Sequence, residues 1–300
     1  MNFYSILYRD PADRPERELP SAPQFFRDLN LDQIVATINI GREEYNLWPF
    51  FYAPLADVDA IAYRHEVMQD LEQAALFENI KAFAQGMRGV RDHLAQVEKL
   101  RHQHQKHRSF LDAAMTYCGV VTRLASDLAS APIASRGLQT FKEYLTGYTN
   151  SPKYIALQQQ TKELSDAFSA IVYGILIQGS RVDVRLPQGE PDYSAEVLRT
   201  FARFKQDTVQ RHKFDFSNAI DVNHIEGQIL DLVARTFANE FSKLDTYSAD
   251  NQKFQDATIL EFDREVEFYL AYQEYITPLK RADLSFCYPE VIQDHVEVFD

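Results

Sequence analysis

Apolar residues recur every three or four positions through most of the chain, which is the spacing of one face of an α-helix. The longest such stripe runs from Ile80 to Leu100, and a second runs from Leu111 to Leu128. Each stripe covers about five turns or more. The regular steps of the second stripe are those of a coiled-coil seam. The two stripes predict long, stiff helices.

Shorter stripes of the same period predict further helices over residues 31–38, 57–71, 138–148, 154–171, 197–204, 225–237 and 259–276. Asp57 is placed to cap the helix that follows it, and Asn30 with Gln33 would form a capping pair for the helix at 31–38. Pro278 is expected to end the last helix.

The period changes to two between residues 172 and 186. An apolar run over 172–177 is followed by a turn at 178–180, and valines then alternate with charged residues. This alternation predicts one β-hairpin over 172–186. The chain as a whole is therefore predicted to be all-α, an elongated multi-helix bundle with long lever-like helices and one small β-hairpin.

The proline pattern suggests how the chain is divided. Prolines interrupt a charged stretch in residues 1–22, which predicts an irregular lead-in. Residues 23–285 are predicted to form one helical domain, and residues 286–300 an extended segment leading out of it.

Charge and cysteine content exclude several classes of protein. The net charge is −13, so the chain lacks the overall basic character of an autonomous nucleic-acid-binding domain. Cys118 and Cys287 lie far apart, which fits a reducing cytoplasm better than a disulfide framework. The sequence contains neither an apolar run long enough for a membrane span nor a secretory signal, so we expect no membrane contact.

The sequence "RHQHQKHRS", residues 101–109, concentrates histidines and basic residues. His102 and His104 would face opposite sides of a helix, and only His104 and His107 share a face. A metal site would need further ligands. We interpret the segment as a solvated turn between two helices, with Ser109 capping the second; contact with a phosphate is the alternative.

Four acids, Glu261, Asp263, Glu265 and Glu267, are spaced along the last predicted helix. A carboxylate-bridged metal bundle would also need Glu-x-x-His on further helices, which is absent. A solvated acidic face is the expected arrangement.

Motifs of catalysis are absent from the sequence. It has neither the phosphate-binding G-x-x-x-x-G-K-[S/T] nor the acyl-transfer G-x-S-x-G, and His224-Ile-Glu226 lacks the downstream P-C-x-x-C of zinc deaminases. We therefore expect no catalytic residue, cofactor or metal in this chain.

Basic residues do gather at and after the predicted hairpin, and they are Arg181, Arg185, Arg199, Arg203 and Lys205. Such residues can lie along DNA phosphates, although Asp183, Glu190 and Asp192 dilute their charge. A DNA-facing surface and a solvated strand face are the two interpretations.

The stretch PFFYAPLADVDAIAYRHEVMQDL, residues 49–71, resembles the start of the core domain in the MutS family of mismatch-repair and related DNA-processing ATPases. The resemblance rests on a Pro-Leu-x-Asp followed by an aliphatic residue, an arginine and further apolar positions: Pro54, Leu55, Asp57, Ile61, Arg64, Met68 and Leu71. His65 stands where many members have Gln. The segment Phe286–Pro289 is similar to the aromatic-x-x-Pro that leads from this core into the ATPase domain.

The resemblance implies a non-catalytic core and lever region that couples nucleotide state to DNA binding, in mismatch repair or a related transaction. It also implies an ATPase domain beyond this chain that holds ATP and Mg²⁺, a homodimer, and DNA as partner. The family's Phe-x-Glu mismatch wedge is not expected here, since Phe141-Lys-Glu143 falls inside a predicted helix. The alternative from another class is a helical protein–protein interaction scaffold with no nucleic-acid role.

Overall fold

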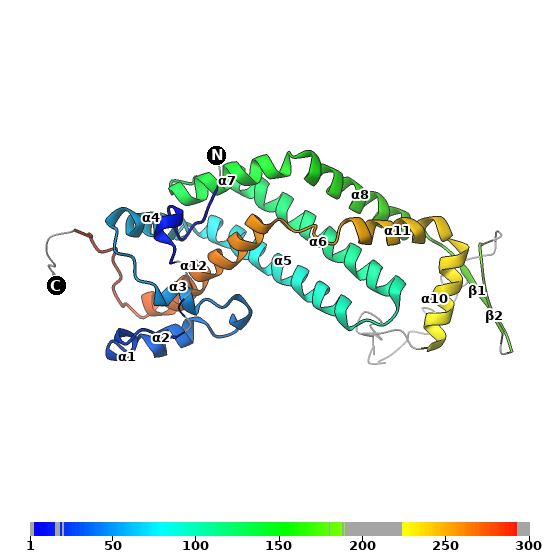
Figure 1. Ribbon diagram of the computed structural model, residues 1–300, viewed down its shortest axis with the longest axis horizontal. Helices are drawn as coiled ribbons and strands as arrows, with labels where there is room; N and C mark the ends of the chain where they lie inside the picture. The colour runs from blue at the N-terminus through cyan, green and yellow to red at the C-terminus, as the bar shows by residue number, and fades with distance from the viewer. Residues whose placement is uncertain are drawn as a thin grey trace, which may run out of the picture. The chain divides into compact units, whose positions relative to one another are not determined.

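The computed structural model describes residues 3–15, 19, 21–179, 181–187, 189 and 224–292. These residues form helices and one two-stranded antiparallel sheet, so the predicted all-α class with a small hairpin is confirmed (Figure 1). The helix predicted over 197–204 lies outside the described residues. None of the helices described could cross a lipid bilayer, because none joins sufficient length to sufficient apolarity.

The elements follow one another in the order η1 Pro11–Asp13, α1 Phe25–Asp28, α2 Leu31–Ile38, η2 Glu43–Tyr45, α3 Trp48–Tyr52, α4 Val58–Asp70, α5 Ala74–Lys99, α6 Gln103–Ser130, α7 Arg136–Thr149, α8 Pro152–Ser169, β1 Gly174–Gln178, β2 Arg181–Arg185, α10 His224–Thr236, α11 Ala238–Asp250 and α12 Ala257–Arg281. The two predicted rods are present as α5, of 26 residues, and α6, of 28 residues.

The chain divides into two compact units. Unit 1 comprises residues 1–90, 116–158 and 253–300, and unit 2 comprises residues 91–115 and 159–252. Because the unit boundaries fall within α5, α6 and α8, these three helices contribute residues to both units.

The core of unit 1 is built around α12. Phe262 of α12 stacks on Phe141 of α7, with ring centroids 3.5 Å apart, and also contacts Phe83 of α5. Phe3, from the start of the chain, meets the edge of Phe141 at 5.0 Å. Segments from the beginning, middle and end of the sequence therefore share one apolar centre.

In unit 1, α5 and α6 approach each other closely at Gly86. A Cβ atom at this position would overlap Cγ2 of Val120 and lie 3.1 Å from its Cγ1. The glycine thus permits a helix–helix contact, although in the sequence it stands out only as a weak point of the helix.

Unit 2 places the hairpin against α10. Val184 of β2 packs on the cluster formed by Val233, Ala234 and Phe241. Strands β1 and β2 pair antiparallel, with Ile175 opposite Val184. The hairpin predicted over 172–186 is observed two residues shorter at its start and one shorter at its end.

The predicted helix ends are partly right. The Asp57 carboxylate accepts a hydrogen bond from Ala60 N, which confirms the cap of α4. Asn30 is wrong as a cap, because it adopts a left-handed conformation and its side chain makes no capping bond. Pro278 does not end α12, which continues to Arg281, since a proline in the last turn removes only one N–H from the helix.

Only the start of the histidine segment is a turn, because residues 101–102 lie between α5 and α6 and the rest belongs to α6. Helix α6 already begins at Gln103, so Ser109 lies inside the helix and does not cap it. Within unit 2, His107 Nδ1 lies 2.7 Å from Asp245 Oδ1, and His102 Nε2 lies 3.2 Å from Asp231 Oδ1. The ring of His104 meets the edge of Phe241 at 4.9 Å. The segment packs against α10 and α11, because these helices carry the acidic and aromatic residues that its histidines contact.

Candidate functional site

A groove of about 460 Å³ lies in unit 1 between α3, α4, α12 and the segment that follows α12. Its lining is largely aromatic or aliphatic: Phe50, Phe51, Leu55, Ile61, Met68, Phe268, Tyr269, Tyr272, Ile276, Phe286, Tyr288 and Pro289. Arg64, His65, Glu72 and Lys280 are its acidic and basic members. A concave, mostly apolar surface with a few polar groups is typical of a binding site.

Both stretches singled out in the sequence, residues 49–71 and 286–289, contribute to the lining of this groove. Pro54, Leu55, Ile61 and Arg64 belong to the first stretch, and Phe286–Pro289 is the second. More than two hundred residues separate the stretches in the sequence. Their positions could not be related to each other until the fold had brought α4 and the end of α12 together.

Tyr288 holds the second stretch against α4 and the turn that follows α4. The Tyr288 hydroxyl donates to Glu72 Oε1 at 3.2 Å, and the Tyr288 ring meets the edge of His65 with centroids 5.4 Å apart. Lys280 Nζ also lies 3.1 Å from Glu72 Oε1. Burial raises the pKa of Tyr288 and lowers the pKa of His65, so both groups favour their uncharged forms.

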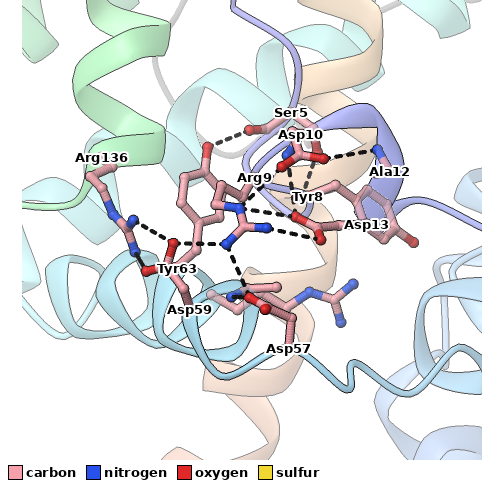
Figure 2. A network of polar contacts seen from close by, with 12 residues as sticks. Ser5, Tyr8, Arg9, Asp10, Ala12, Asp13, Asp57, Asp59, Tyr63 and Arg136 are labelled. Atoms are coloured by element: carbon pink, nitrogen blue, oxygen red, sulfur yellow. Dashed lines mark hydrogen bonds and ion pairs between the residues drawn. The ribbon is translucent and has the colours of Figure 1, made fainter.

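Side chains of α4 and α12 bind the main chain of an N-terminal segment, Phe3–Tyr8. This segment is neither helix nor strand. The Tyr63 hydroxyl of α4 donates to the carbonyl oxygen of Ser5 at 2.7 Å (Figure 2). The Tyr269 hydroxyl of α12 donates to the carbonyl oxygen of Ile6 at 2.7 Å. Two helices thus supply side-chain donors to consecutive carbonyl groups.

Other main-chain groups of residues 6–8 also have partners. Arg64 Nε donates to the carbonyl oxygen of Leu7 at 2.8 Å. The Ser5 hydroxyl oxygen accepts from the amides of Leu7 and Tyr8 at 2.9 and 3.0 Å. The Ile6 amide donates to Glu265 Oε2 at 2.9 Å. Because buried main-chain polar groups require partners, these contacts permit the segment to lie in the core.

The acids of the last helix are not a solvated face, which corrects the expectation from the sequence. Asp263, Glu265 and Glu267 are buried on α12. Glu265 accepts from the Ser5 hydroxyl at 2.5 Å, and Glu267 pairs with Arg42 Nε at 3.0 Å. The signal was present in the sequence, since Glu265 lies three residues after the apolar Phe262 and four before Tyr269, on one helix face. Glu261 is half-buried and pairs with Arg14 at 2.9 Å.

The ionisation of Glu265 depends on opposing effects. Burial raises the pKa of its carboxyl group to about 7, while hydrogen bonds from Ser5 and Ile6 act in the opposite direction. Glu261 raises the pKa further and Arg14 lowers it. Glu265 therefore titrates close to neutral pH in the middle of the segment's binding contacts.

A charged network continues from this segment at the surface (Figure 2). Arg9 donates to Asp57 Oδ1 at 3.0 Å and to Asp59 Oδ2 at 2.8 Å. Arg136 of α7 also lies 2.9 Å from Asp59. Hydrogen bonds from Arg136 and Arg9 lower the pKa of Asp59 to about 2. Asp57 thus caps α4 and also binds Arg9, the residue that follows the N-terminal segment.

Of the five basic residues singled out in the sequence, Arg199, Arg203 and Lys205 lie outside the described residues. Arg181 and Arg185 are exposed on β2, and their positions in the strand place them on one face of the hairpin, opposite to Val184. Arg181 Nε is 3.0 Å from Asp183 Oδ2, so an acidic neighbour already reduces the charge of this face.

Among the residues described, no group of histidine, cysteine and carboxylate side chains has a geometry that could hold a metal ion. The chain was also compared with protein-family models, with curated proteins and with solved structures, and nothing matches it in any of the three comparisons.

Proposed function

We propose that this chain is the non-catalytic core and lever region of a MutS-like DNA-processing ATPase. In this role it couples the nucleotide state of an ATPase domain to DNA binding, in mismatch repair or a related DNA transaction. ATP and Mg²⁺ belong to that ATPase domain, and the protein acts in the cytoplasm as a homodimer. DNA is the partner of the assembled protein.

One observation carries the proposal: the two MutS-like stretches line a single groove. The first would begin the core and the second would lead from it to the ATPase domain. If motion is to pass between them, they must be in contact, and the Tyr288–Glu72 and Tyr288–His65 contacts provide this. The length of α5 and α6 fits the lever role, because long helices transmit displacement with little bending.

DNA binding by the 300-residue chain tests the proposal. We expect duplex and branched DNA, followed by fluorescence anisotropy, to bind with an affinity that falls steeply as salt is added. Replacing Arg181→Glu and Arg185→Glu together should weaken binding and make the slope of log K against log salt shallower by about two.

The matched control reverses two exposed arginines elsewhere, Arg27→Glu and Arg123→Glu. Arg123 pairs with Asp127 as Arg181 pairs with Asp183, so the loss of a local ion pair is the same. Absence of DNA binding at low salt would contradict the DNA role and favour the helical interaction scaffold. ATP turnover by this chain would contradict the assignment of catalysis to another domain.

A further inference from the structure

The N-terminal segment, Phe3–Tyr8, lies against α4 and α12 in the way that a bound peptide lies on a receptor. A helix face offers no free main-chain donors or acceptors, because its amides and carbonyls bond within the helix. A bent segment that is neither helix nor strand must therefore be bound to such a face by side chains. Four side chains do this here, Tyr63, Arg64, Glu265 and Tyr269, and we call them the peptide slot.

The slot binds mainly through the peptide main chain. Each of the four residues contacts a main-chain amide or carbonyl, and the distances lie between 2.7 and 2.9 Å. In peptide recognition, such contacts supply affinity while pockets for side chains supply specificity.

Specificity comes from the side chains of residues 5–8. Ser5 places its hydroxyl on Glu265, and Ile6 and Leu7 are completely buried. The Arg64 guanidinium lies over the Tyr8 ring, with Arg64 Cζ 5.0 Å from the ring centroid. The accepted pattern is accordingly serine, two aliphatic residues and an aromatic residue.

We propose that Tyr63, Arg64, Glu265 and Tyr269 form a binding site for a short, bent peptide of the pattern Ser-aliphatic-aliphatic-aromatic, which residues 5–8 of the same chain fill. The slot accepts such a peptide in trans once the covalent link is opened. This inference does not depend on the MutS-like role, so either can fail alone.

The test cuts the chain after it has folded. A protease site is inserted between Ser21 and Ala22, which are both exposed. The cut protein is mixed with a fluorescent synthetic peptide of residues 1–21, and anisotropy is recorded. We expect the labelled peptide to replace the resident piece and to saturate at one peptide per chain.

A peptide N-methylated at Ile6 lacks the amide hydrogen that Glu265 accepts, and it should bind at least about tenfold more weakly. The matched control peptide is N-methylated at Leu19, which is 40% exposed, and should bind like the unmodified peptide.

Three results would overturn the inference: unfolding of the chain on cutting, a resident piece that never exchanges over days, or equal binding of the two methylated peptides. In each case residues 5–8 would be an ordinary part of the core and no separable ligand.

Discussion

Glu265 shows at the residue scale how a single side chain can link the pH to the stability of a whole unit. It is fully buried, and it accepts hydrogen bonds from the Ser5 hydroxyl and the Ile6 amide, which both belong to the N-terminal segment. A carboxylate accepts both bonds. A protonated carboxyl keeps one oxygen that can accept from the Ile6 amide, and its other oxygen becomes a hydrogen-bond donor.

The raised pKa fixes the sign of the pH dependence. Because the pKa is about 7 in the folded chain and 4.5 ordinarily, folding favours the protonated form. The stabilisation from Glu265 is complete below pH 4.5 and is lost as the pH rises through about 7. The difference corresponds to about 3 kcal/mol of unfolding free energy.

Glu265→Gln should remove this dependence, since glutamine resembles the protonated carboxyl at every pH. Urea unfolding followed by circular dichroism between pH 4.5 and 8 should show the wild-type chain losing stability relative to the variant as the pH rises. The control is Glu78→Gln, at an exposed position of α5. Parallel curves for wild type and Glu265→Gln would contradict the assignment.

At the scale of single elements, helix packing explains features that helix propensity alone misjudges. Gly86 and Gly89 occupy the same helix and weaken it to the same degree by propensity. Their surroundings in the structure differ. A Cβ at Gly86 would overlap Val120, whereas a Cβ at Gly89 would meet nothing within 4 Å. The first glycine is needed for the contact between α5 and α6 in unit 1, and the second is not.

These two glycines therefore give opposite predictions. Gly86→Ala should destabilise the chain by about 1–3 kcal/mol, the usual penalty for overpacking. Gly89→Ala should stabilise it by up to about 1 kcal/mol, because alanine favours the helix and the space is open. Thermal unfolding of both variants compares them directly, and a stabilising Gly86→Ala would show that the helices can separate freely at this point.

The end of α4 illustrates a second effect at this scale. Asp70, in the last turn, is buried and accepts from the amides of Ala134 and Ser135 at 3.1 and 2.7 Å. One carboxylate thus satisfies the amides of the chain entering α7. Sequence spacing could not identify this partner, because 65 residues separate Asp70 from Ser135.

At the scale of the whole molecule, Arg64 and Tyr269 connect two features of unit 1. Both residues line the groove, and both bind carbonyl groups of the N-terminal segment. A substitution in Phe286–Pro289 should therefore change the binding of the N-terminal segment, because Arg64 and Tyr269 contact both the groove and the segment.

A double-mutant cycle of Tyr288→Phe and Ser5→Ala measures this connection. Tyr288→Phe removes the hydroxyl that binds Glu72, and Ser5→Ala removes the hydroxyl that binds Glu265. We expect a coupling of about 0.5 kcal/mol or more in unfolding free energy. A control cycle of Ser5→Ala with Thr146→Ala, an exposed position of α7, should be additive. Additivity in both cycles would mean that the groove and the segment are independent.

Taken alone, the sequence determined the helical class, the two long helices, the hairpin and the cap at Asp57. These features depend on residues close together in the chain, since a helix or hairpin repeats its geometry every few positions. The aromatic segment at 286–289 and the motif at 54–64 could also be recognised in this way, but only as separate stretches.

Only the tertiary structure decided which polar groups are buried and which stretches meet. The acids of α12 were expected in solvent, because periodicity gives the face on which a residue lies without saying what covers that face. Ser5 covers Glu265 from 260 positions away. The histidine segment acquired its partners from α10 and α11 for the same reason. Burial depends on contacts between distant segments, and these follow from the fold and not from local spacing.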